Sequence, residues 1–313
     1  MNNFKKIGLS ALAGSLVATS AFAGEMSVAG GASINVEHTN GGNADTGKTF
    51  SMGNQLTFSG GGELDNGLNV ALSFVIDQGD DTAIGSGPFD SHSVTISSDS
   101  LGSLKFSGEG GSSALTAMDG TAAGDIWDNF DIASTVHPTG IGGGNNSMMY
   151  TLPAIMDGVA INASYTPRGA SADSSTAWNV SYTGVEGLTA SYAMGDGSNE
   201  STDGTAFKLS YAFGPITAGY STYEYDTTGT SADNDTTGYQ ISYTVSDELS
   251  VTYGAEEIEE GTGNDVETMR ISTAYTAGGM TISASMGEID NMDGTTNADQ
   301  DRERWALGLS FAF

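Results

Sequence analysis

The sequence predicts an all-β protein, a transmembrane antiparallel up-and-down β-barrel of about 16 strands. Three observations predict it. Large apolar residues recur at every second position in about sixteen segments. Short and long connections alternate between these segments, and aromatic residues gather near the short connections. The composition agrees, because the 313 residues include 45 Gly and no Cys, and residues that favour strands and turns are abundant.

The first 23 residues have the pattern of a secretory signal peptide. Lys5 and Lys6 form a positive region, residues 7–19 are largely apolar, and Ala21-Phe22-Ala23 matches an A-x-A cleavage site. We therefore expect residues 1–23 to be removed and residues 24–313 to form the barrel domain. No later segment has enough continuous apolar residues to cross a membrane as a helix, so a membrane form would cross with strands.

The last segment, RWALGLSFAF at 304–313, shows the alternation most clearly. Its large apolar residues stand at Trp305, Leu307, Leu309, Phe311 and Phe313. One face of such a strand is apolar, and the other is polar or small. The same period occurs earlier, in chain order, at Met26, Val28, Ile34 and Val36; Met52, Leu56 and Phe58; Leu68, Val70, Leu72, Phe74 and Ile76; Val94 and Ile96; Leu104 and Phe106; Met148 and Tyr150; Val159, Ile161 and Tyr165; Trp178, Val180 and Tyr182; Leu188, Tyr192 and Met194; Phe207, Leu209, Tyr211 and Phe213; Ile216 and Tyr220; Tyr239, Ile241, Tyr243 and Val245; Leu249, Val251 and Tyr253; Met269, Ile271 and Tyr275; and Met280, Ile282 and Met286.

The connections separate a membrane barrel from a soluble sandwich, whose strands would also alternate. Short connections fall at 65–67, 99–102, 153–158, 184–187, 214–215, 246–247 and 278–279. Long, acidic connections rich in Gly, Ser and Thr fall near 39–49, 78–91, 110–145, 168–175, 195–204, 226–236, 259–265 and 288–301. Short turns on one side and long loops on the other are typical of an outer-membrane barrel.

Aromatic residues of the apolar face mark the short-turn end of the strands. They are Tyr182, Tyr211, Phe213, Tyr243, Tyr275, Phe311 and Phe313. Rings at one level are typical of the girdle at a membrane–water interface. The apolar phase that receives this face is therefore predicted to be lipid.

The charge of the chain is strongly acidic, with 39 Asp and Glu against 9 Lys and Arg and a formal net charge of −30. This balance argues against nucleic acid as a partner, because binding phosphates requires a basic face. Beyond the predicted signal peptide, Lys48 lies in the first long loop, and six basic residues fall on the polar face of their strands when the alternation is extended: Lys105, Arg168, Lys208, Arg270, Arg302 and Arg304. A Lys or Arg facing lipid at mid-depth would cost about 2–4 kcal/mol, which explains this placement.

With these features together, the chain resembles a Gram-negative general diffusion porin and is most similar to the alphaproteobacterial porins. The resemblance covers residues 24–313. It rests on the strand count, the terminal Phe313, the turn Leu64-Asp65-Asn66-Gly67, and the position of the longest loop, which is the third long one. It implies a homotrimer of sixteen-stranded barrels in the outer membrane, in contact with lipid and lipopolysaccharide. It also implies that the third loop folds into each channel as a constriction.

The resemblance further implies an acidic loop that faces a basic wall across the constriction. The loop carries Asp119, Asp125, Asp128 and Asp131. The wall is expected to carry Lys105, Lys208 and Arg270, then Arg304, with Arg168 and Arg302 nearer the mouth. A surface position for this loop would leave Ile126, Trp127, Phe130 and Ile132 exposed. Insertion is therefore expected, mainly because the resemblance implies it.

The predicted function is a water-filled channel, cation-preferring because of the sparse basic set and the acidic net charge, for passive diffusion of small hydrophilic solutes. Two alternatives stay open: a porin selective for a sugar or cationic nutrient, and an acidic calcium-binding surface-layer protein. A sugar-selective channel would use an aromatic track in the lumen, for which Tyr223 and Tyr225 are candidates.

Enzymatic chemistry is not predicted. The three histidines are His38, His92 and His137, and none stands in a pattern that pairs a base with a nucleophile. We expect no cofactor and no dedicated metal site. Calcium at the acidic loops is a possibility that the sequence leaves open, with candidates at Asp80-Asp81, 256–260 and 290–293.

Overall fold

The computed structural model describes residues 26–41, 47–77, 89–130, 132, 140–168, 173–197, 202–227, 233–260, 263–294 and 301–313. Sixteen strands form one sheet: β1 (Ser27–Asn40), β2 (Gly47–Glu63), β3 (Asn69–Asp77), β4 (Phe89–Ser98), β5 (Gly102–Glu109), β6 (Ser147–Thr151), β7 (Val159–Thr166), β8 (Ser175–Tyr182), β9 (Leu188–Asp196), β10 (Thr202–Phe213), β11 (Ile216–Thr227), β12 (Asn234–Thr244), β13 (Leu249–Glu260), β14 (Val266–Ala277), β15 (Met280–Asp290) and β16 (Arg302–Ala312). Two short 3-10 helices, η2 (Ile126–Phe130) and η4 (Met292–Gly294), lie between strands. Within these ranges no helix reaches the length and hydropathy of a membrane-spanning helix.

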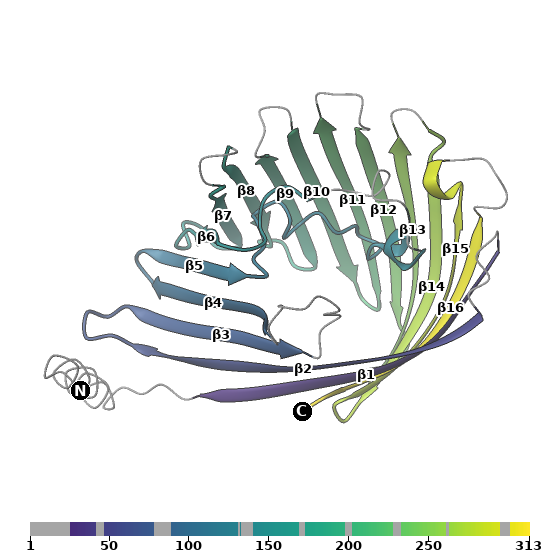
Figure 1. Ribbon diagram of the computed structural model, residues 1–313, viewed down its shortest axis with the longest axis horizontal. Coiled ribbons are helices and arrows are strands. Elements are labelled where there is room, and N and C mark those ends of the chain that lie inside the picture. The colour runs from purple at the N-terminus through teal and green to yellow at the C-terminus, as the bar shows by residue number, and fades with distance from the viewer. Residues whose placement is uncertain are drawn as a thin grey trace, which may run out of the picture.

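The sheet is a closed antiparallel barrel in which each strand pairs with its neighbours in sequence and β1 pairs with β16. Figure 1 shows the strands following one another around the curve, from β1 to β16. The predicted fold class and strand number are confirmed. Closure leaves no unpaired sheet edge, so every strand can satisfy its backbone hydrogen bonds inside a membrane.

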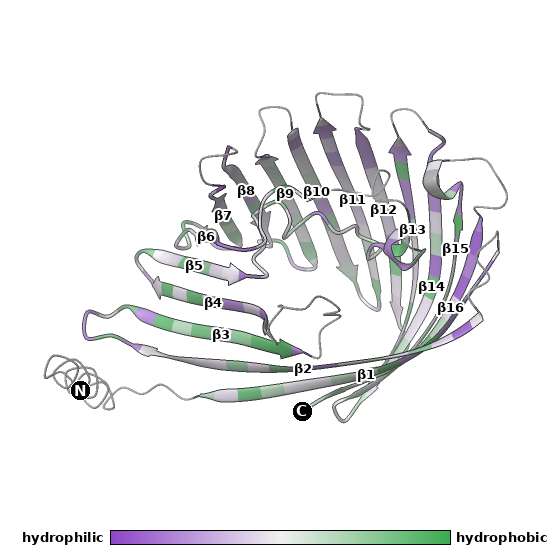
Figure 2. Ribbon diagram, in the orientation of Figure 1, coloured by the Kyte–Doolittle hydropathy of each residue, from purple (hydrophilic) through white to green (hydrophobic). Residues whose placement is uncertain are grey.

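Figure 2 shows hydrophobic bands interspersed with pale and hydrophilic bands along the strands. The two faces of the barrel differ as the alternation predicts. Large apolar residues of the outward face are exposed along the whole wall, and they form cross-strand pairs such as Phe58 with Phe74 and Tyr220 with Tyr239. The opposite face carries small and polar residues and contacts the segment between β5 and β6, which identifies it as the inward face. An exposed apolar exterior and a polar interior are the arrangement of a membrane barrel.

Tight turns join the strands at the end where the aromatic residues gather. Gly278 and Gly279 alone connect β14 to β15, with φ of 59° and 80°. Positive φ at both positions fits a hairpin turn whose twist matches that of the flanking strands, and glycine adopts it without a Cβ clash. At the turn after β2, the backbone nitrogen of Gly67 donates to the oxygen of Leu64 at 2.8 Å.

The C-terminal residue takes part in barrel closure. The nitrogen of Gly30 on β1 donates to the oxygen of Phe313 at 2.6 Å, and the nitrogen of Phe313 donates to the oxygen of Gly30 at 3.0 Å. A Cβ at Gly30 would collide with the Phe313 ring. Glycine at this position therefore makes room for the terminal ring.

One expectation needs correction. Lys48 is not in the first loop, because β2 begins at Gly47 and Lys48 pairs with His38 on β1. The ring of His38 lies 6.2 Å from that of Trp305, centroid to centroid, so this pair belongs to the outward face. The predicted loop boundary was late because the polar run before Phe50 continues the strand instead of ending it.

Candidate pore constriction

The connection between β5 and β6 lies against the inward face of the barrel. Figure 1 shows this segment, with η2 near its middle, running inside the curve of the strands. Its two ends are tied together where it leaves the wall, because the nitrogen of Gly111 donates to the oxygen of Gly144 at 3.0 Å. Residues 131 and 133–139 of this connection lie outside the described ranges. We call the connection 110–146 the inserted loop.

One apolar cluster fixes the first part of the inserted loop. It is made of Ala114, Leu115, Met118 and Ile141 from the loop and of Ala177, Ala193, Ala206 and Tyr223 from the wall, with Met149 and Tyr225 packed against it. The wall residues are small where the loop comes closest: a Cβ at Gly204 would lie 2.9 Å from both Leu115 and Ile141. Tyr223 and Tyr225, the candidates for an aromatic track, therefore pack under the loop.

A second apolar cluster fixes the middle of the inserted loop. Ile126, Phe130 and Ile132 are buried against Ile258, Val266, Ile289 and Met292 of the wall and η4, and Trp127 is partly buried beside them. The expectation that these loop residues need a packing partner is confirmed. Full burial of a large apolar side chain stabilises by about 1.5–3 kcal/mol, so the two clusters together hold the loop firmly.

Wall side chains also satisfy the backbone of the inserted loop. The nitrogen of Ala114 donates to Ser164 Oγ at 2.9 Å, and the oxygen of Ala114 accepts from Asn179 Nδ2 at 2.6 Å. Further along, the nitrogen of Ala122 donates to Ser221 Oγ at 2.7 Å. A loop inside a barrel needs such partners because water reaches its buried backbone groups poorly.

Glu256 of β13 is the central polar anchor. Its buried carboxylate accepts hydrogen bonds from Thr121 Oγ1, from the nitrogen of Ile126 at 2.9 Å and from the nitrogen of Trp127 at 3.1 Å. Thr268 Oγ1 on the neighbouring strand donates to the same carboxylate at 3.1 Å. The sequence placed this residue only among the calcium candidates. Its position on the polar face, two residues after Gly254, was the available signal for a role in the lumen.

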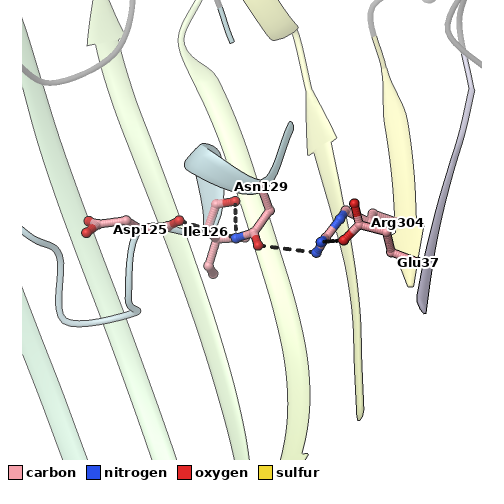
Figure 3. Close-up of polar contacts among 5 residues, drawn as sticks. All are labelled: Glu37, Asp125, Ile126, Asn129 and Arg304. Carbon is pink, nitrogen blue, oxygen red and sulfur yellow. Dashed lines mark hydrogen bonds and ion pairs between the residues drawn. The ribbon is translucent and has the colours of Figure 1, made fainter. Parts of the chain in front are cut away.

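Three arginines of the predicted basic wall bond to the inserted loop. Arg270 Nη2 donates to the oxygen of Ala123 at 2.9 Å, and Arg302 Nη1 donates to the oxygen of Phe130 at 3.2 Å. Arg304 Nη1 donates to Asn129 Oδ1 at 3.2 Å, and its Nη2 forms an ion pair with Glu37 of β1 (Figure 3). These side chains lie on the inward face as predicted, but their described partners in the loop are two backbone oxygens and an amide.

Lys208 of β10 interacts electrostatically with two loop carboxylates, those of Asp119 and Asp125. Burial and the nearby Asp125 raise the pKa of Asp119 to about 6, and the positive charge of Lys208 opposes this rise. The other predicted basic residues make no described contact with the loop. Lys105 is exposed in β5, and Arg168 is exposed two residues beyond the end of β7.

The four predicted loop acids occupy different environments. Asp119 and Asp125 are partly buried, and Asp125 Oδ1 accepts from the nitrogen of Thr121 at 2.7 Å. Asp128 is exposed on η2, whereas Asp131 lies outside the described residues. A field between acidic and basic groups across the passage stays a prediction.

The side of the lumen that faces the inserted loop is built from β1 to β5. A recess of about 720 Å³ lies there, and small or acidic residues such as Ser33, Gly53, Asp77 and Asp90 line part of it. Among the described residues, apolar clusters fill the space between the loop and the wall from β8 to β15, whereas no such cluster lies between the loop and the wall from β1 to β5.

The predicted interface aromatics lie where the alternation places them. All seven are on the outward face near the short turns, with exposed fractions from 37% at Tyr182 to 76% at Phe313. Their exposure on an isolated barrel fits contact with lipid head groups, because such rings prefer the membrane–water boundary.

A closed barrel of sixteen antiparallel strands, apolar outside and polar inside, is the architecture of the outer-membrane channels of Gram-negative bacteria. The comparisons with known proteins agree. The model of the family described as Gram-negative porin matches residues 8–313. The chain belongs to this family, and it is an outer-membrane channel without enzymatic activity. The comparison with curated protein sequences found no match.

Solved porin structures share the fold at low sequence identity. An anion-selective porin from Comamonas acidovorans is 16% identical, with 92% of this chain and 99% of that chain covered and a TM-score of 0.67. A mutant of the Rh. blastica porin is 14% identical, with 92% and 100% covered and a TM-score of 0.67. An OmpF of Salmonella typhi, in complex with daunomycin, is 11% identical, with 93% and 98% covered and a TM-score of 0.67.

Proposed function

We propose that the protein is a cation-preferring channel for passive diffusion of small hydrophilic solutes and ions, with the inserted loop as its constriction. The charge distribution around the passage carries the proposal. Arg304 is paired with Glu37, and Lys208 interacts electrostatically with Asp119 and Asp125. In contrast, Asp128 is exposed on the loop, and the exposed Asp90 lines the recess on the facing wall.

The net effect is a negative potential in the passage. The charges of Arg304 and Lys208 are partly offset by nearby carboxylates, whereas exposed carboxylates attract cations and raise their local concentration. Loss of Lys5 and Lys6 with the proposed signal peptide would take the net charge from −30 to −32 and favour cations further. The signal peptide itself lies outside the described residues.

The test is the reversal potential of the refolded protein, residues 24–313, in a planar bilayer under a KCl gradient. We expect a potential that favours K⁺, larger at low salt, because the Debye length is about 10 Å at 0.1 M and shortens at higher concentration. A chloride-favouring potential would overturn the cation preference while leaving the channel function intact. Anion selectivity is compatible with this fold, as the name of the Comamonas porin shows.

The alternatives from the sequence receive less support. An aromatic track for a sugar would need exposed lumen rings, but Tyr223 is buried and Tyr225 packs on the first apolar cluster. The closed barrel and the family favour a channel over a surface-layer protein. We therefore propose a non-specific channel.

Assembly and calcium remain proposals. We propose a homotrimer, in keeping with the resemblance, and chemical crosslinking in outer-membrane fragments would test it. Calcium would have to use acidic groups other than Glu256, because that carboxylate is bonded to the loop. Asp80 and Asp81 lie outside the described residues. Among the residues with described positions, no group of three or more acidic or histidine side chains is placed to hold a metal ion.

A further inference from the structure

A chain of polar contacts joins the inserted loop to β1. Arg304 on β16 donates through Nη1 to Asn129 Oδ1 on η2 at 3.2 Å and pairs through Nη2 with the carboxylate of Glu37. Figure 3 shows the guanidinium between the two partners. The side chain of Arg304 is only 16% exposed, against 35% for Glu37. The two Nη groups of Arg304 are thus directed to different elements.

Asn129, the loop residue in this set of contacts, is itself held in place. Asn129 Nδ2 donates to the oxygen of Ile126 at 3.0 Å and to the oxygen of Asp125 at 3.4 Å. The amide therefore turns its NH₂ toward η2 and its oxygen toward Arg304, as donor and acceptor roles require. A displacement of η2 would move Asn129 with it and would strain or break the contact with Arg304.

The position of these polar contacts in the barrel allows them to act on the width of the passage. The inserted loop leaves the wall at β5, and its apolar clusters and backbone contacts lie against strands from β6 to β15. Arg302 holds the end of η2 on β16. Within the described part of the chain, hydrogen bonds reach β1 from the loop only through Arg304, and β1 borders the open passage.

We propose that Glu37, Arg304 and Asn129 form a strut that fixes the distance between η2 and β1 and thereby sets the size limit of the passage. The proposal deepens the channel function proposed above and rests on it. Arg304 is then a positioning residue. Its planar guanidinium can bond to two partners in different directions, which the single ammonium of Lys does less well.

Two measurements in planar bilayers separate a change in the position of the loop from a change in the charge of the passage. The size limit is measured as the largest polyethylene glycol that still lowers single-channel conductance, and charge is read from the reversal potential. We expect Arg304→Gln to raise both the size limit and the cation preference. Glu37→Gln, which keeps an acceptor for Arg304, should lower the cation preference with an unchanged limit.

The decisive variants keep the charge balance and break the strut. The double variant E37Q/R304Q should return the reversal potential to the wild-type value while its size limit stays raised. Asn129→Ala removes no charge and lies outside the barrel wall, so it should raise the limit alone. The control is Lys105→Gln, which removes a positive charge from the exposed inward side chain of β5 and should shift only the reversal potential.

A wild-type size limit in both N129A and E37Q/R304Q, with folded barrels shown by heat-dependent gel mobility, would overturn the strut. If the double variant does not fold, N129A decides alone: a raised limit supports the strut and an unchanged one overturns it. Absence of conductance from the folded wild-type protein is a different result. It would reject the proposed channel function, on which the strut depends.

Discussion

The carboxylate of Glu256 on β13 accepts a hydrogen bond from the backbone nitrogen of Ile126, 130 positions earlier in the chain, at 2.9 Å. Both residues are buried. The same carboxylate bonds to Trp127 and Thr121, so one wall side chain satisfies three groups of the inserted loop. Hydrogen bonds to a buried carboxylate are stronger than those between neutral groups, which makes Glu256 the main polar support of the loop.

Glu256→Gln should loosen the inserted loop. An amide offers one acceptor oxygen in place of two, so an NH₂ group would face a backbone or hydroxyl donor of the loop. Loss of a buried hydrogen bond costs about 1–3 kcal/mol, and roughly 1.4 kcal/mol changes a population tenfold. We expect a noisier open-channel current and faster proteolysis within residues 110–146, measured by bilayer recording and mass spectrometry.

Glu257→Gln is the matched control for this change, because Glu257 is the next residue of β13 and lies on the outward face, paired with Glu267. It removes the same charge without a described contact to the loop. Equal noise in the E256Q and E257Q variants would contradict the anchoring role of Glu256.

Neutralising Lys208 and Arg270 together should increase the cation preference. Each is an inward positive charge near the loop, and a unit charge at 4 Å in water changes the energy of a passing ion by about 1 kcal/mol, or roughly fivefold in relative permeability. Arg270 also donates to the oxygen of Ala123, so this double variant should disturb the loop as well.

Lys208→Gln alone separates the effect on ion selectivity from the effect on the loop. Lys208 interacts with the loop through its charge, whereas Arg270 also donates a hydrogen bond to it. Lys208→Gln should raise the cation preference without additional current noise. An unchanged reversal potential in both variants would mean that these two residues contribute no field to the passage.

The barrel could be predicted from the sequence because the membrane and the lumen impose a two-residue period on every strand. Phe207 and Lys208 illustrate this: neighbours in β10, they face lipid and lumen respectively. Turn-forming residues predicted the short connections between strands, as at Gly278-Gly279. Where the chemical contrast fades, as around Lys48, the predicted strand end was wrong.

The arrangement of the constriction could be predicted only in part. The alternation along the strands predicted that Arg270 and Arg304 lie inside the barrel. The apolar residues of the loop predicted that the loop packs against another part of the protein. Which atoms meet depends on contacts between residues far apart in sequence, such as Arg304 with Glu37 and Asn129. A charge pattern states that an arginine faces inward, but it does not distinguish an arginine that faces a solute from one that holds a loop.

The pKa of Asp119 predicts a pH-dependent selectivity. Burial, with a smaller effect from Asp125, raises this pKa from 3.8 to about 6, against the opposing charge of Lys208. Asp119 is therefore charged at pH 7.5 and neutral at pH 4.5. We expect the cation preference to fall as the pH is lowered through about 6, measured as reversal potential at fixed KCl gradient.

The same pKa sets the sign of the effect on stability. Between pH 3.8 and about 6 the folded form binds more protons at Asp119 than the unfolded form does, so stability rises as the pH falls through this window. Asp119→Asn should abolish both the step in selectivity near pH 6 and this contribution to stability. Asp128→Asn, which changes an exposed carboxylate, should lower the cation preference and leave the step in place. A step that persists in D119N would assign it to another group.

Gly30→Val should impair barrel closure. The Val side chain would collide with the ring of Phe313, whose backbone forms two hydrogen bonds with Gly30 at the seam between β1 and the C-terminus. The ring of Phe313 is largely exposed, so it would turn away from β1 and lose its packing beside the pairing that closes the sheet. We expect a smaller fraction of folded barrel after refolding, measured by heat-dependent gel mobility. Ala32→Val is the control, because Ala32 lies two positions along on the same face and pairs with Phe311 inside the regular ladder. Equal folded fractions for G30V and A32V would show that the terminal ring does not need the space that glycine leaves, and that closure depends on the backbone pairing alone.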